Sequence, residues 1–272
     1  MISAISPSRI APFEIVRRAL ELMRASWASL TAVVVSKAIV LAIVAGGALA
    51  LSAYLQMATP EEISPVRRQQ LHAWLGIALI VSWSMLSSFQ RAVTIAVTLR
   101  DPDSLAARDA VARALRDRWA RVAVVGAALA LVDTVVIVGG MVFLFSELSP
   151  FVIRVSLSGL AIWYVAVWLS SRGVAGVVMA LVVHEGIALR ALSASFGLLR
   201  AHRLASVATR ALPASIAALS ALAVWDAGFL GLGAVLALVE PVVVAIDAVI
   251  EAAWYSRLRP SLDARAIAST FD

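Results

Sequence analysis

Cysteine is absent from this 272-residue sequence, lysine occurs only as Lys37, and histidine occurs three times. Without cysteine the chain can form no disulfide, no thiolate metal site and no covalent haem attachment. The three histidines, His72, His184 and His202, do not share a ligand spacing on one helix, so no metal site is expected. Phosphate-binding and dinucleotide-binding glycine patterns are also missing in the strand-to-helix context they need, so no cofactor is expected.

Charged residues make up only 15% of the sequence, against 62% hydrophobic residues and a mean hydropathy of +0.94. These values are typical of a membrane protein. The net charge of +6 comes from arginine, and such a surplus is expected in cytoplasmic loops that face anionic lipid. Because the arginines are spread over several short loops, a nucleic-acid partner is not expected.

Long apolar runs dominate the sequence and predict an all-α, polytopic membrane protein with one integral membrane domain over residues 1–272. About thirty residues of mixed charge precede the first run, so it is interpreted as a retained span and not as a signal peptide. Six transmembrane helices are predicted, over residues 31–57, 71–99, 122–145, 151–183, 208–224 and 229–255.

An arginine-rich amphipathic segment precedes each predicted helical hairpin, over residues 13–30, 105–122 and 185–207. In the first segment, Phe13, Val16, Leu20, Met23, Trp27 and Leu30 are predicted to share one apolar face. The ends of the segments match, as Trp27-Ala28-Ser29-Leu30, Trp119-Ala120-Arg121-Val122 and Leu204-Ala205-Ser206-Val207. The pattern predicts three pseudo-repeats, at about 13–99, 105–183 and 185–255, followed by a cytoplasmic tail over 256–272.

The amphipathic segments are expected to lie in the membrane interface. Trp27 and Trp119 would sit at headgroup depth, while Arg116 and Arg200 would reach into water. Seventeen arginines fall on the side of these segments and of the tail, including Arg210, against three on the opposite side. The positive-inside rule therefore predicts that both termini lie in the cytoplasm.

Ionisable residues inside the predicted spans form the candidate polar site, because each one needs protein, water or a ligand as a partner in lipid. They are Arg91, Asp133, Arg172, Glu240, Asp247 and Glu251. Lys37 is interpreted instead as a residue that reaches the inner interface.

Two interpretations of this site remain open. In the structural one, Arg91 and Arg172 pair with Asp247 and Glu251 and hold the helices together. In the functional one, the polar residues line a cavity for a charged or zwitterionic ligand. Asp133 and Glu240, which have no evident basic partner at their depth, would then be proton or cation sites.

Three stretches resemble the membrane domain of bacterial membrane-bound glycerophosphoryl diester phosphodiesterases and its stand-alone relatives. They are MALVVHEGIALRALSASFGLLRAHRLASV, FQRAVTIAVTLRDPDSLAARDAVARAL and AAWYSRLRPSLDAR. The resemblance implies a bacterial inner-membrane protein with this membrane architecture but without the activity, because the soluble segments are too short to encode the catalytic barrel of those enzymes.

The function expected from the sequence is that of a non-enzymatic scaffold or membrane-complex subunit that contacts lipids or partner proteins. The alternative is a small transporter or lipid-handling protein with a polar intramembrane cavity. An intramembrane enzyme is less favoured, since no nucleophile and base occur together.

Overall fold

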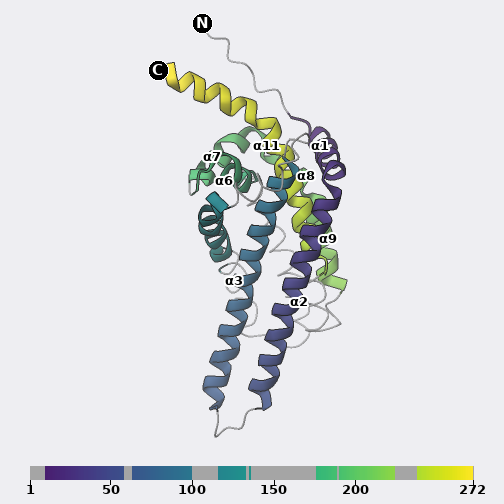
Figure 1. Ribbon diagram of the computed structural model, residues 1–272, viewed down its shortest axis with the longest axis vertical. Coiled ribbons are helices and arrows are strands. Elements are labelled where there is room, and N and C mark those ends of the chain that lie inside the picture. Colours follow the sequence, from purple (N-terminus) through teal and green to yellow (C-terminus); the bar gives the residue numbers. More distant parts are fainter. Residues whose placement is uncertain are drawn as a thin grey trace.

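The computed structural model describes residues 10–57, 63–99, 116–132, 135, 176–188, 190–223 and 238–271. Within these ranges all regular structure is helical, as the all-α prediction requires (Figure 1). The labelled helices are α1 (Pro12–Ala25), α2 (Trp27–Met57), α3 (Pro65–Thr98), α6 (Val178–Glu185), α7 (Arg190–Leu199), η1 (Arg200–His202), α8 (Arg203–Thr209), α9 (Ala211–Ala223) and α11 (Glu240–Phe271). A further helix occupies residues 116–132.

Helices α2 and α3 are long and apolar enough to cross a membrane, with hydropathies of 2.3 and 1.4 in their apolar 18-residue windows. Their 31 and 34 residues exceed the 20 or so that a bilayer requires. Ser64 and Pro65 begin α3, where the Ser64 hydroxyl accepts a hydrogen bond from the Arg67 amide at 3.3 Å. The two helices enclose the spans predicted over 31–57 and 71–99, apart from the final residue of the second.

Most of the apolar surface of α2 and α3 is uncovered, since only 11% and 12% of their apolar windows are buried. Figure 1 shows the distal halves of both helices extending side by side beyond the other described helices. A core helix of a soluble protein would bury most of these side chains. The exposed ones include Ile39, Ile43, Leu51, Tyr54 and Met57 on α2.

Helix α1 buries a different face from the predicted one. Ile15, Ala19 and Leu22 are its buried residues, and the helix packs mainly against α11 and α8. The predicted apolar face remains exposed at Phe13, Val16 and Leu20. Helix α1 therefore has two sets of apolar side chains. One set packs against other helices, and the other is exposed and available to an apolar environment outside the protein.

The third amphipathic segment was predicted as one unit beginning at Glu185, and this boundary is wrong. Glu185 is instead the last residue of α6, which ends where Gly186 adopts the left-handed conformation with φ of 67°. Glycine suits this position because it has no Cβ to clash with the backbone. The rest of the segment is divided into α7, η1 and α8.

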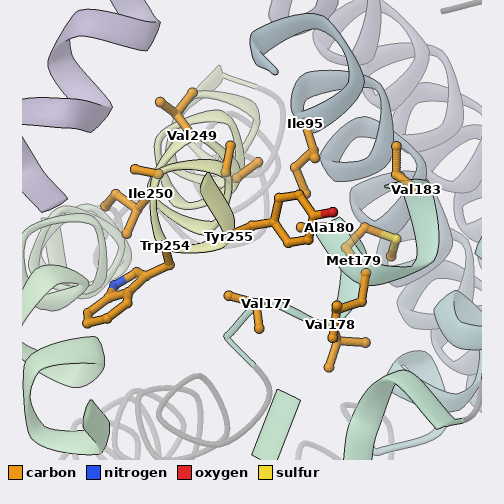
Figure 2. Packing of buried hydrophobic residues seen from close by; sticks show 14 of the residues in the cluster. Ile95, Val177, Val178, Met179, Ala180, Val183, Val249, Ile250, Trp254 and Tyr255 are labelled. Carbon is orange, nitrogen blue, oxygen red and sulfur yellow. The ribbon is translucent and has the colours of Figure 1, made fainter. Parts of the chain in front are cut away.

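The short apolar helix α6 lies at the centre of the hydrophobic core. All six of its residues from Val178 to Val183 are buried, and the helix packs against α3, α7 and α11. Figure 2 shows the α11 residues Tyr255 and Trp254 on different sides of their helix, with the Tyr255 ring directed toward Ile95 and Ala180. This packing positions the charged residues of α3 and α11 described below.

Helix α11 begins at Glu240 and continues past Tyr255, where the last span was predicted to end, through the predicted tail to Phe271. The third, fourth and sixth predicted spans are helical over 122–132, 178–183 and 240–255, whereas the fifth is interrupted at Arg210, between the end of α8 and the start of α9. The remaining parts of these spans, and residues 105–115 of the second amphipathic segment, lie outside the described residues.

Candidate functional site

Three acidic side chains, Glu240, Asp247 and Glu251, lie on one face of α11 because they are seven and four residues apart. Their side chains are 11%, 1% and 1% exposed, so each must be satisfied by groups on neighbouring helices. Each carboxylate has a different set of partners, and together these partners connect α11 to α2, α3, α6 and the α8–α9 junction.

Asp247 lies between two arginines. Its Oδ2 is 2.9 Å from Nη2 of Arg91 on α3, and its Oδ1 accepts a hydrogen bond from Nε of Arg210 at 2.9 Å. The fully buried Arg210 also donates to the Gly176 carbonyl at 2.6 Å and to the Ser206 hydroxyl at 2.7 Å. Asp247 thereby joins α3 to the α8–α9 junction.

Glu251 holds the N-terminus of α6. Its Oε1 accepts hydrogen bonds from the amides of Met179 at 2.7 Å and Ala180 at 3.0 Å. The first amides of a helix have no intrahelical acceptor, and the positive end of the helix dipole favours a carboxylate there. Arg91 Nη1 is 4.0 Å from the other oxygen of Glu251, which is too long for a direct hydrogen bond.

Glu240 pairs with Lys37 of α2, which corrects two expectations from the sequence. The ammonium of Lys37 lies 2.7 Å from Oε1 of Glu240 and 2.8 Å from the Ser87 hydroxyl, and Ser87 itself donates to Glu240 at 2.6 Å. Lys37 is only 6% exposed, so it does not reach the interface. Glu240 therefore has a basic partner, supplied by α2 from 203 residues away.

The C-terminal end of α6 is satisfied by a second charged side chain. Nη1 of Arg118, on the helix over 116–132, donates to the Val183 carbonyl. Cations at a helix C-terminus interact favourably with its exposed carbonyls. Both ends of this buried helix are therefore held by charged residues from other helices, as an apolar environment requires.

His184 and Glu185 contact Tyr255 just beyond this end. The Tyr255 hydroxyl donates to Glu185, and the His184 ring stacks on the tyrosine with centroids 5.3 Å apart. Burial lowers the pKa of His184 below its ordinary 6.5, and the positive charges of Arg118 and Arg259 act in the same direction. Glu185 opposes them, with a smaller effect on this pKa.

The six candidate residues are thus divided between two clusters and the undescribed part of the chain. Arg91, Asp247 and Glu251 lie together, and Glu240 belongs to the separate Lys37 cluster. Asp133 and Arg172 lie outside the described residues. Arg210 was counted among the cytoplasmic arginines, but it is fully buried and pairs with Asp247.

The proposed interfacial anchors are all at the surface. Trp27 is 65% exposed and Trp119 is 61% exposed, and Arg116 and Arg200 are exposed as well. Leu204, which occupies the matching position in the third segment, is 87% exposed. Isolated large apolar side chains of this kind, beside exposed arginines, suit the boundary between lipid and water.

The chemistry available to the two clusters is ion pairing and hydrogen bonding. Among the described residues no group of three or more potential ligands could hold a metal ion. The one titratable base in the ion pairs of these clusters is Lys37, since arginine stays protonated in proteins.

Sequence reasoning missed Lys37 and Arg210 as members of these clusters because it assigned each to a membrane surface. The available signal was the number of acidic residues on α11: three carboxylates on one face exceeded the arginines assigned to the spans beside it.

Comparisons of the chain with protein-family models, with curated proteins and with solved structures find no match.

Proposed function

We propose that the chain is a non-enzymatic inner-membrane protein that acts as a scaffold or a subunit of a membrane complex and contacts lipids or partner proteins. The observation that carries the membrane part is the exposure of α2 and α3, which are apolar throughout their windows and only 11% and 12% buried there. Monomeric soluble proteins rarely leave so large a continuous apolar surface in water.

The proposal includes six spans in three pseudo-repeats, with both termini in the cytoplasm. The distribution of arginine, seventeen on one side and three on the other, supports this orientation even with the buried Arg210 removed from the count. The matching exposure of Trp27, Trp119 and Leu204 supports the equivalence of the three amphipathic segments. The resemblance to the membrane domain of glycerophosphoryl diester phosphodiesterases belongs to the same proposal, without that activity.

The structural role of the charges is supported by how completely they are paired. Three carboxylates, Glu240, Asp247 and Glu251, face three bases, Lys37, Arg91 and Arg210. The contacts connect α11 to α2, α3, α6 and the α8–α9 junction. A carboxylate that carries a proton or a cation during transport must release its partner, whereas these partners are held by further hydrogen bonds.

Topology can be tested with single cysteines, because the chain has none of its own. Arg67→Cys, on the predicted outer side, should react with a membrane-impermeant maleimide in intact cells. Arg200→Cys should react only after the membrane is opened. Labelling of both positions from the same side would contradict the proposed orientation, and recovery of the chain in the soluble fraction would contradict the membrane assignment.

The scaffold role can be separated from transport in liposomes that contain a pH-sensitive dye. Under a potassium diffusion potential, proteoliposomes with the wild-type chain should acidify no faster than empty liposomes. A flux that depends on the wild-type chain and disappears in Glu240→Gln would favour the transporter instead. Correct folding of the variant would be checked by circular dichroism and gel filtration.

A further inference from the structure

Three side-chain polar atoms of α3 have no direct hydrogen-bond partner among the described residues. They are Nε and Nη1 of Arg91 and the hydroxyl of Thr94, and all three are buried. Thr94 is 0% exposed. The hydroxyls of Ser88 and Thr98, on the same helix, donate to carbonyls four residues earlier, at 3.0 and 2.9 Å. The Thr94 hydroxyl therefore departs from the usual local pattern and needs another partner.

The same region contains an ion pair that is too long to be direct. Nη1 of Arg91 and Oε2 of Glu251 are 4.0 Å apart. Two hydrogen bonds of about 2.8 Å that meet at one water place their end atoms about 4.0–4.6 Å apart when the angle between the bonds lies between about 90° and the tetrahedral value. The separation of this pair is therefore the one expected for groups bridged by a single water molecule.

Thr94 lies at the level of this gap. Ser87 contacts Glu240 and Arg91 contacts Asp247, so the residue numbers on α3 and α11 increase together and the helices run in the same direction. One helical turn beyond these contacts, Thr94 on α3 and Glu251 on α11 reach the same height, since they follow Arg91 and Asp247 by three and four residues.

We infer that an ordered water molecule is bound inside the protein by Arg91 Nη1, the Thr94 hydroxyl and Glu251 Oε2. Three partners are the usual number for a buried water. An anion could use the same two donors, but Glu251 would repel it, and the positive charges of Arg91 and Arg210 are already matched by Asp247 and Glu251. The site depends only on contacts between α3 and α11, so it stands apart from the proposed scaffold function.

This water makes Arg91 and Glu251 a water-mediated pair and gives Thr94 a defined role as a positioning residue. The test is a density map of the full chain in lipid nanodiscs, at a resolution where other buried waters are visible. The expected result is a peak within hydrogen-bond distance of the three groups. The isosteric variant Thr94→Val should lose or weaken the peak, whereas Thr98→Val should retain it because its hydroxyl bonds to backbone carbonyls.

Two results would overturn the inference. One is a wild-type map with no peak at this position while Arg91 and Asp247 remain paired. The other is a peak that acquires a bromide anomalous signal in crystals grown with bromide in place of chloride, which would identify an anion. Should Thr94→Val fail to fold, the wild-type map alone still decides. Failure of the water site would leave the labelling and flux tests of the proposed function unaffected.

Discussion

Arg91 and Arg210 pair with the same carboxylate, yet their removal should have unequal consequences. In both Arg91→Met and Arg210→Met, Asp247 keeps one guanidinium at 2.9 Å, and the cluster loses one positive charge. Arg91→Met also removes the cation that lies 4.0 Å from Glu251, but Glu251 keeps its hydrogen bonds to the first amides of α6, so we expect a similar electrostatic cost in the two variants. Because Asp247 retains a partner, this cost should fall at the lower end of the roughly 3–5 kcal/mol that follows from breaking a buried pair.

Hydrogen bonds to the backbone distinguish the two arginines. Arg210 also satisfies the Gly176 carbonyl at 2.6 Å and contacts the Ser206 carbonyl at 3.2 Å. The methionine variant leaves these acceptors without that donor. A buried acceptor left unsatisfied lowers the stability of the fold by about 1–3 kcal/mol. Arg91 makes no comparable contact with the backbone of the described residues. Arg210→Met should therefore be more destabilising than Arg91→Met by about 2 kcal/mol.

The free energies of unfolding can be compared by titrating SDS into mixed micelles and following helicity by circular dichroism. Arg200→Met, at an exposed arginine, is the matched control and should change stability by less than about 0.5 kcal/mol. Equal destabilisation by Arg91→Met and Arg210→Met, or a larger effect of Arg91→Met, would refute the argument that backbone contacts decide the difference.

Three further predictions use the same unfolding measurement. Glu251→Gln should be at least about 1 kcal/mol less destabilising than Glu251→Ala, because the amide oxygen can still accept from the first amides of α6; equal effects would contradict the capping role. Lys37→Met and Glu240→Met should each lower the free energy of unfolding by about 3–5 kcal/mol, while the double variant should recover most of this loss. Additive losses would show that the pair is not coupled. The lowered pKa of His184 means that the unfolded chain takes up a proton more readily, so stability should be full above pH 6.5 and decline as the pH falls below it. His184→Gln should flatten this decline without abolishing it, because burial also lowers the pKa of His202; an unchanged slope would contradict the assignment to His184.

The helices of the N-terminal hairpin could be predicted from sequence because their signals are local. Long apolar runs predicted α2 and the part of α3 from residue 71, whereas the beginning of α3 at Ser64 and Pro65 was not predicted. The pairing of Arg91 with Asp247 could be anticipated because an ionised residue in an apolar span needs an opposite charge. Helical spacing placed the three acidic residues on one face of α11 without any knowledge of their neighbours.

The predictions for Lys37 and Arg210, which depended on which other helix lies nearby, were wrong. Lys37 and Arg210 were assigned to the membrane surfaces from their distances to span ends along the sequence, and each meets its carboxylate through tertiary packing. The amides held by Glu251 and the carbonyl held by Arg118 are backbone groups and have no signature in the sequence. Glu185 was assigned to the wrong element because Gly186, which ends α6, could equally have stood inside a longer segment.

The requirement that every buried backbone group be paired gives the charged residues of this protein a common explanation. Helix α6 is short and buried from Val178 to Val183, and Glu251 and Arg118 hold backbone groups near its two ends. Arg210 does the same for the Gly176 carbonyl while it pairs with Asp247. Contacts of this kind are fixed by the fold and cannot be released without exposing backbone groups.

The cluster of Lys37 and Glu240 differs from the others in chemistry. Its base can lose a proton, the contacts of Lys37 and Glu240 with the described residues are made with side chains, and Glu240 is the more exposed partner at 11%. Within the described residues, then, any proton-linked transport should arise at this pair and not at the arginine cluster. An effect of Glu240→Gln on proton flux, without a matching effect of Arg91→Met, would locate such behaviour there and would limit the scaffold role to the remainder of the network.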